Sequence, residues 1–171
     1  MGLSDPAFMQ RHGKELEEDV GRWIDHVWHG KPLTWERVEN ICKLWKKITN
    51  GRPFVLKGIQ SVEDAEKAIS IGCDGIVVTN HAGRQVDGAV GSLEVLPDIA
   101  KAVGHKTTIL FDSGIRNGSD IIKALSLGAH AIMVGRLWVY SMSSGGDNGV
   151  RHIMKSLLAV SFLKFYKSFF Q

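Results

Sequence analysis

The sequence contains few cysteines and no long apolar run, and both absences narrow the class of protein. Cys42 and Cys73 are its only cysteines and form no CxxC pair, so a disulfide framework and a structural zinc site have no support, and a reducing, intracellular compartment fits. No stretch of about 18 apolar residues occurs, which argues against an integral membrane segment. An acidic cluster at residues 15–19 stands where a secretory signal needs an apolar run. We therefore expect a cytoplasmic protein, since the C-terminus also carries no peroxisomal tripeptide.

The net charge is small, +3 from 21 basic and 18 acidic residues, and the charges are spread along the chain. Recognition of nucleic-acid phosphates usually needs a clustered basic face, so we expect no nucleic-acid partner. His26 and His29 have the spacing of a helical metal pair, but no carboxylate or cysteine completes a ligand set, and we expect no metal. The composition, with 44% hydrophobic residues and 19 glycines in 171 residues, suits one compact domain.

Residues 4–50 have the apolar spacing of helices. Asp5 and Pro6 predict the start of a first helix, which the break at 30–32 ends. Thr34 is placed to cap a second helix that ends near Asn50 and Gly51. We expect this helical segment to serve as scaffold.

From Pro53 onwards short apolar runs alternate with helical segments, which predicts four β/α units over residues 53–159. Continuous apolar runs fit parallel strands that are buried on both faces and joined by right-handed crossovers. Ser61, Ser92 and Ser119 are each placed to cap one of the intervening helices. The predicted strands are 54–56, 75–78, 108–111 and 131–134.

An internal repeat supports this order. The repeated unit is a helix that ends at a glycine and turns directly into a buried strand, and this unit is typical of a (β/α) barrel. A Rossmann sheet stays an alternative, although no GxGxxG follows any predicted strand. At one constant offset, Asp64, Ala68, Gly72, Ile76 and Val78 superpose on Asp120, Ala124, Gly128, Ile132 and Val134.

Polar residues follow the predicted strands at their carboxyl ends, the face on which barrel enzymes build active sites. Lys57, after the first strand, offers a fixed positive charge for an anion on a flavin or a phosphate. Thr79 and His81 follow the second strand, and the imidazole has the ordinary pKa range of a general base. Arg84, three residues further on, offers a planar fork for a carboxylate.

A phosphate site is expected after the third and fourth strands. Backbone N–H groups of the two glycine turns and two guanidinium groups are placed to surround one phosphate. Barrels usually bind phosphate after strands seven and eight, which makes these strands the second half of an eight-stranded barrel. The residues concerned are Asp112, Ser113, Gly114 and Arg116 in the first turn and Gly135 and Arg136 in the second.

These motifs, in this order and spacing, closely resemble those of the FMN-dependent L-2-hydroxy-acid oxidase and dehydrogenase family. The resemblance covers about residues 4–159, and the run from Gln85 to Leu93 looks most like the lactate 2-monooxygenase branch. It implies a TIM (β/α)8-barrel fold, of which residues 1–159 form the C-terminal half, with FMN as cofactor and a small 2-hydroxy acid such as lactate or glycolate as substrate. The motifs are Lys57-Gly58, Asn80-His81-Ala82-Gly83-Arg84-Gln85, Asp112-Ser113-Gly114-Ile115-Arg116 and Gly135-Arg136.

The resemblance also implies a role for each residue. Lys57 would face the flavin N1/O2 edge and Thr79 would stand near the flavin. His81 would take a proton from the substrate, whose carboxylate Arg84 would bind. The ribityl-phosphate site would be lined by Asp112, Ser113, Gly114, Arg116, Gly135 and Arg136.

The chain departs from the family pattern in several places. Ala82 and Ser113 stand where the family commonly has glycine, and the family's first four strands are missing, with the carboxylate that orients the histidine. Residues 160–171 form an atypical tail, read either as a membrane-surface anchor or as the result of a truncated gene product. We therefore expect doubtful activity for this chain alone and self-association through open barrel edges. A non-catalytic half-barrel module and a different phosphate-binding barrel, such as an isomerase, are the alternatives.

Overall fold

The computed structural model describes residues 5–12, 16–27 and 32–169. The chain divides into two compact units, Met1–Val38 and Glu39–Gln171. The first contains α1 (Pro6–His12) and α2 (Leu16–Val27) where the sequence predicted one helix. Residues 13–15 between them lie outside the described residues, as do His29 and residues 30–31 of the predicted break at 30–32. The cap on α1 is confirmed, because Asp5 Oδ1 accepts the backbone N–H groups of Ala7 and Phe8 at 2.8 and 3.0 Å.

Helix α3 (Trp35–Ile48) spans the boundary between the units. Its predicted ends are confirmed. Thr34 Oγ1 accepts the Arg37 N–H at 3.3 Å, and the helix ends in two left-handed residues, Asn50 (φ 55°) and Gly51 (φ 84°). Val38 and Cys42 of this helix are buried, whereas its apolar residues Leu44 and Ile48 are exposed.

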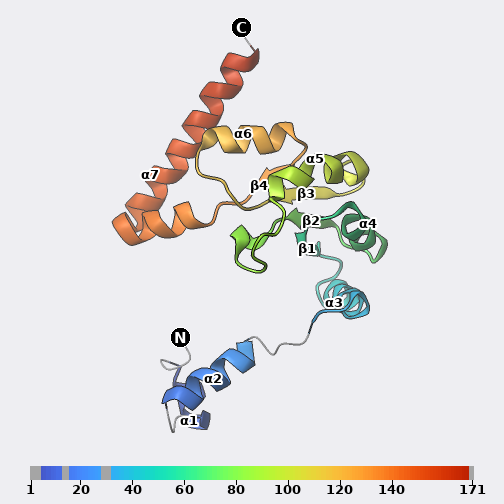
Figure 1. The fold of residues 1–171 in the computed structure, drawn as a ribbon, viewed down its shortest axis with the longest axis vertical. Helices are drawn as coiled ribbons and strands as arrows, with labels where there is room; N and C mark the ends of the chain where they lie inside the picture. Colours follow the sequence, from blue (N-terminus) through green and yellow to red (C-terminus); the bar gives the residue numbers. More distant parts are fainter. Residues whose placement is uncertain (1–4, 13–15, 28–31, 170–171) are drawn as a thin grey trace. The chain divides into compact units, whose positions relative to one another are not determined.

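The second unit is built on a four-stranded parallel sheet in the order β1-β2-β3-β4 (Figure 1). Each strand is joined to the next through one α-helix, and the β2–β3 connection also contains a 3-10 turn at His81–Gly83; this confirms the predicted alternation of strands and helices. The strands are β1 (Val55–Ile59), β2 (Gly75–Val78), β3 (Thr108–Phe111) and β4 (Ala131–Ile132), and the connecting helices are α4 (Val62–Ser70), α5 (Ser92–Val103) and α6 (Gly118–Ser126).

The core of this unit lies around the two central strands. All of β2 is buried, and in β3 the side chains of Ile109 and Phe111 are buried. The prediction of four buried strands is wrong for β1, of which only Ile59 is buried and Val55 keeps 43% of its surface, and for β4, whose two residues are exposed and half-buried. The reason is their place at the sheet edges, where each pairs with a single neighbour among the described strands.

The internal repeat has a common geometry in both copies. Gly72 (φ 95°) and Gly128 (φ 105°) end α4 and α6 in the left-handed region. In each copy the residue after the glycine donates its N–H to a fully buried alanine five residues earlier, from Cys73 to the carbonyl of Ala68 and from Ala129 to that of Ala124, both at 3.1 Å.

Of the three serines predicted to cap the helices between the strands, only Ser61 does so. Ser61 Oγ accepts the Asp64 N–H at 3.1 Å. The prediction for Ser119 is wrong, because Asn117, two positions earlier, is extended (φ −153°) and its side chain and that of Asp120 form a reciprocal capping box. The prediction for Ser92 is also wrong, because Gly91 takes the capping position and the serine becomes the first helical residue.

Helix α7 (Arg136–Phe169) follows β4 and is kinked at Gly145 and Gly146 (Figure 1). Gly149 lies against the preceding segment, where an added Cβ would come within 2.1 Å of the Ser141 carbonyl oxygen. The helix runs through the stretch predicted as a tail. None of the helices in the described part of the chain is both long and apolar enough to cross a bilayer.

Candidate active site

The carboxyl edge of the sheet brings together Lys57, Thr79, His81, Asp112 and Ser113. Thr79 directly follows β2, and Asp112 follows β3 and extends the ladder by donating its N–H to the Val78 carbonyl at 3.0 Å. Lys57 was predicted to follow the first strand, but it lies within β1. Gly58 (φ 106°) makes an irregularity in the strand, and pairing with β2 resumes at Ile59.

Asp112 is the electrostatic centre of this edge. Its Oδ2 accepts a hydrogen bond from the Thr79 hydroxyl at 2.8 Å and lies 3.1 Å from Lys57 Nζ. Burial raises the pKa of Asp112, but the hydrogen bond from Thr79 and the hydrogen bond and charge of Lys57 outweigh burial, so the pKa is lowered. The carboxyl group is therefore ionised at neutral pH.

The His81–Gly83 turn follows β2 in an unusual backbone conformation. His81 (φ 55°), Ala82 (φ 59°) and Gly83 (φ 71°) are all left-handed, which costs free energy for the two residues that carry a Cβ. The guanidinium of Arg136 donates to the Ala82 carbonyl oxygen at 3.1 Å, and therefore ties this turn to the start of α7.

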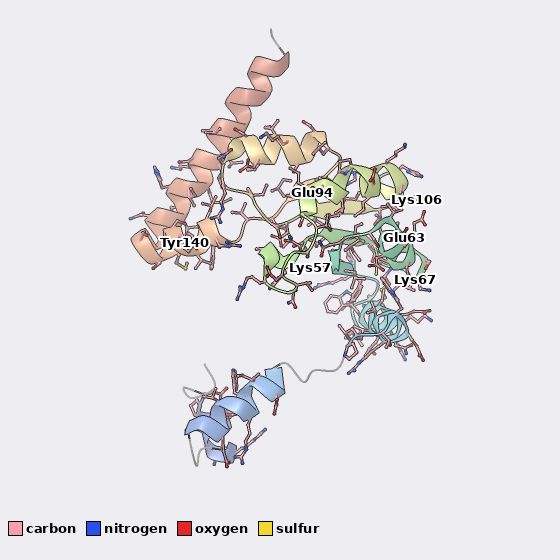
Figure 2. The ribbon with its side chains drawn as sticks, in the orientation of Figure 1. Lys57, Glu63, Lys67, Glu94, Lys106 and Tyr140 are labelled. Atoms are coloured by element: carbon pink, nitrogen blue, oxygen red, sulfur yellow. The ribbon has the colours of Figure 1, made fainter. Side chains whose placement is uncertain are left out.

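The His81 imidazole lies beside Lys57, with Nδ1 3.3 Å from Nζ. Lys57 is labelled in Figure 2, where it lies next to the loop that carries His81. Both side chains are exposed. Arg84 ends the turn at an exposed position, with its backbone N–H on the His81 carbonyl at 3.3 Å.

Two residues that received no role in the sequence-based site hold the base of this loop. The buried Ser92 hydroxyl accepts the Asn80 backbone N–H at 2.8 Å. The Asn80 amide spans the loop, since Oδ1 accepts the Gly83 N–H at 3.2 Å and Nδ2 donates to the Val90 carbonyl at 3.3 Å. No sequence signal distinguishes the role of Ser92 in this loop from that of a helix cap. The position of Asn80 directly before His81 is a sequence signal that could have indicated its role in the loop.

The predicted phosphate residues line one cleft with an empty volume of about 360 Å³. Gly114 (φ 82°) and Gly135 face open space, since a Cβ built on either meets no atom within 4 Å. A second hollow of about 650 Å³ shares four of its lining residues and reaches Asn80 and Gly83. The cleft is lined by Ala82, Asp112, Ser113, Gly114, Ile115, Arg116, Met133, Gly135 and Arg136.

Comparison with known proteins identifies the family. The model of the FMN-dependent dehydrogenase family matches residues 3–159. An FMN-dependent alpha-hydroxy acid dehydrogenase of Penicillium citrinum is 48% identical over 166 residues, covering 93% of this chain and 40% of the relative, and an L-lactate oxidase of Lysinibacillus sphaericus is 42% identical over 156 residues, covering 91% and 39%. A mandelate oxidase variant with a monooxide FMN adduct superposes with a TM-score of 0.68 at 46% identity, covering 74% of this chain and 38% of that one.

This chain belongs to the FMN-dependent dehydrogenase family. It spans about 40% of the length of the curated relatives that it matches. The partial barrel predicted from the sequence is confirmed, because a parallel four-stranded α/β sheet superposes on part of a mandelate oxidase.

Proposed function

We propose that this edge of the sheet is the FMN-phosphate and substrate-carboxylate side of a site that oxidises an L-2-hydroxy acid to the 2-keto acid. Residues 1–159 correspond in this proposal to the C-terminal half of the family's domain. The observation that carries it is the cleft, in which two glycine turns and two arginines from separate β/α units converge. Relatives named for alpha-hydroxy acids and for lactate favour a small 2-hydroxy acid as substrate.

The cleft fits the phosphate of FMN. Arg116 and Arg136 line it with guanidinium groups that pair well with phosphate oxygens. The backbone of Gly114 and Gly135 is open to a ligand, because neither glycine has a neighbour where a side chain would stand. Helix α7 begins at Arg136, so its N-terminal dipole adds positive potential at the same place.

The substrate side consists of His81, Arg84 and Lys57. FMN, when bound, supplies the acceptor for the two electrons that leave the hydroxy acid. In the proposed reaction Arg84 binds the substrate carboxylate and the His81 imidazole takes the proton that leaves the substrate. Lys57 supplies positive charge beside His81, and Asp112 holds the lysine at 3.1 Å.

The neighbour of His81 Nδ1 determines which nitrogen carries the proton. An ammonium group only donates hydrogen bonds, so in this contact Nδ1 accepts from Lys57, which favours the tautomer with the proton on Nε2. A general base at Nε2 needs the opposite tautomer, with Nδ1–H donating to an acceptor such as a carboxylate. This contact favours the second candidate function, a half-barrel that binds FMN without turnover.

Flavin titration tests the proposed phosphate site. We expect the chain to bind FMN more tightly than riboflavin, which lacks the phosphate, when binding is measured by quenching of the flavin fluorescence. Loss of a charge-assisted hydrogen bond costs about 1.5–3 kcal/mol, so Arg116→Ala and Arg136→Ala should each weaken FMN binding by roughly 10- to 150-fold and remove the preference over riboflavin.

Arg151→Ala is the matched control, because it removes an exposed arginine of α7 outside the cleft. Arg116→Ala guards against an indirect effect, since Arg136 also binds the Ala82 carbonyl. Equal affinity for FMN and riboflavin, or FMN binding that neither arginine in the cleft affects, would contradict the proposal.

A further inference from the structure

The left-handed turn at His81 and Ala82 is held by two hydroxyl groups from neighbouring strand ends. Thr79 Oγ1 accepts the His81 backbone N–H at 2.9 Å, and Ser113 Oγ accepts the Ala82 backbone N–H at 2.9 Å. The two hydroxyl oxygens are themselves 2.9 Å apart. Because both residues of the turn carry a Cβ in the left-handed region, the conformation needs such contacts to persist.

The direction of every hydrogen bond in this group follows from the ionised Asp112. A carboxylate only accepts, so the single Thr79 hydroxyl proton points to Asp112 Oδ2, 2.8 Å away. Both lone pairs of Thr79 Oγ1 then accept, one from the His81 N–H and one from the Ser113 hydroxyl. The Ser113 proton is thus committed to Thr79, and a lone pair of Ser113 is committed to Ala82.

Ser113 is itself strained, with φ at 89°. Glycine would adopt this conformation more easily, but it would bring no hydroxyl to the Ala82 amide. Thr79 is 1% exposed, so a solvent molecule cannot replace the Ser113 hydroxyl as its hydrogen-bond partner.

We infer that Ser113 is a positioning residue for His81: its hydroxyl compensates for the left-handed Ala82 and, through Thr79 and Asp112, fixes the turn that presents the imidazole. The positioning role of Ser113 rests on the proposed function of His81. The hydrogen bonds of Ser113 to Thr79 and Ala82 do not depend on that function. It follows that the Ser113 hydroxyl proton is not available to a cofactor, and that this residue can meet a phosphate only through its backbone.

A double-mutant cycle in the full 171-residue chain without FMN tests the inference. We expect Ser113→Ala to raise the hydrogen-exchange rate of the Ala82 amide at least tenfold and to shift the His81 imidazole signals in 1H–15N spectra. In an Ala82→Gly background, where residue 82 no longer carries a Cβ in the left-handed region, the same substitution should leave the imidazole signals in place. Ser126→Ala, at an exposed serine of α6, is the control and should change neither readout.

Ser113→Gly removes the hydroxyl and relieves the strain at that position, so it replaces Ser113→Ala if the latter does not fold. Unchanged Ala82 exchange in both variants would overturn the assignment of the hydroxyl. Equal shifts of the imidazole signals with and without the Ala82→Gly substitution would overturn the compensation. Because no flavin is present, these outcomes are independent of whether FMN binds.

Discussion

The two copies of the internal repeat allow backbone strain to be separated from steric overlap. Gly72 (φ 95°) and Gly128 (φ 105°) occupy the same position after α4 and α6. A Cβ on Gly72 meets nothing within 4 Å, whereas a Cβ on Gly128 would lie 2.4 Å from the Ala100 Cβ of α5. Gly72→Ala therefore tests left-handed strain alone, and Gly128→Ala tests the same strain together with a clash.

Left-handed backbone costs a residue with a Cβ about 1–2 kcal/mol, which is the loss of unfolding free energy expected for Gly72→Ala. Overpacking a closed contact adds about 1–3 kcal/mol, so Gly128→Ala should lose about 2–5 kcal/mol. Urea unfolding at one fixed protein concentration measures both, because self-association would otherwise alter the apparent stability.

Ala100→Gly is the internal control, since it removes the atom that the new Cβ would meet. In the Gly128→Ala background, Ala100→Gly should recover the unfolding free energy lost to the clash. The gain is smaller by about 1 kcal/mol, because glycine destabilises a helix interior. Equal losses for Gly72→Ala and Gly128→Ala would refute the clash, and a neutral Gly72→Ala would refute the strain.

Three further predictions follow from the site and the sheet edges. The pKa of Asp112 is lowered in the folded state, so its contribution to stability is complete above the unfolded-state pKa of about 3.9 and is lost as the pH falls through the folded-state pKa. Asp112→Asn should remove this part of the pH dependence of stability, measured by urea unfolding at acidic pH. The chain should self-associate through β1 and β4 in sedimentation, and a compact monomer at micromolar concentration would argue against open edges. L-lactate should not bleach FMN anaerobically with this chain alone, whereas residues 1–159 joined to a family N-terminal half should do so until His81→Ala is introduced.

The parts of the fold that the sequence predicted correctly are those that local chemistry determines. The helix, glycine and strand units were visible because Gly72 and Gly128 mark the same left-handed position twice. Burial of β1 and β4 was predicted wrongly, because an apolar run such as that around Val55 carries no information about whether a neighbouring strand lies beside it.

The site shows the same division. The convergence of Lys57, Thr79, His81 and Asp112 follows from parallel strands that end at one edge, and a sequence of alternating strands and helices is enough to predict it. The sequence wrongly predicts Ser92 as a helix cap, because a serine at the start of a helix has the same sequence pattern whether it caps that helix or accepts from a distant amide. Long-range polar contacts of this kind depend on the three-dimensional fold.

Flavin binding and turnover have different structural requirements, and the proposed site depends on them to different degrees. The proposed phosphate cleft is made by two short turns and the arginines within them, so each part is formed by its own local segment once β3 and β4 are paired. Proton transfer depends instead on the hydrogen bond that the far side of the His81 ring makes, and there Lys57, a donor, takes the place of an acceptor. Because the tautomer that the Lys57 contact favours lacks the Nε2 lone pair that a base needs, and the proposed phosphate contacts do not involve His81, we expect affinity for FMN to survive in a chain whose His81 does not act as a base.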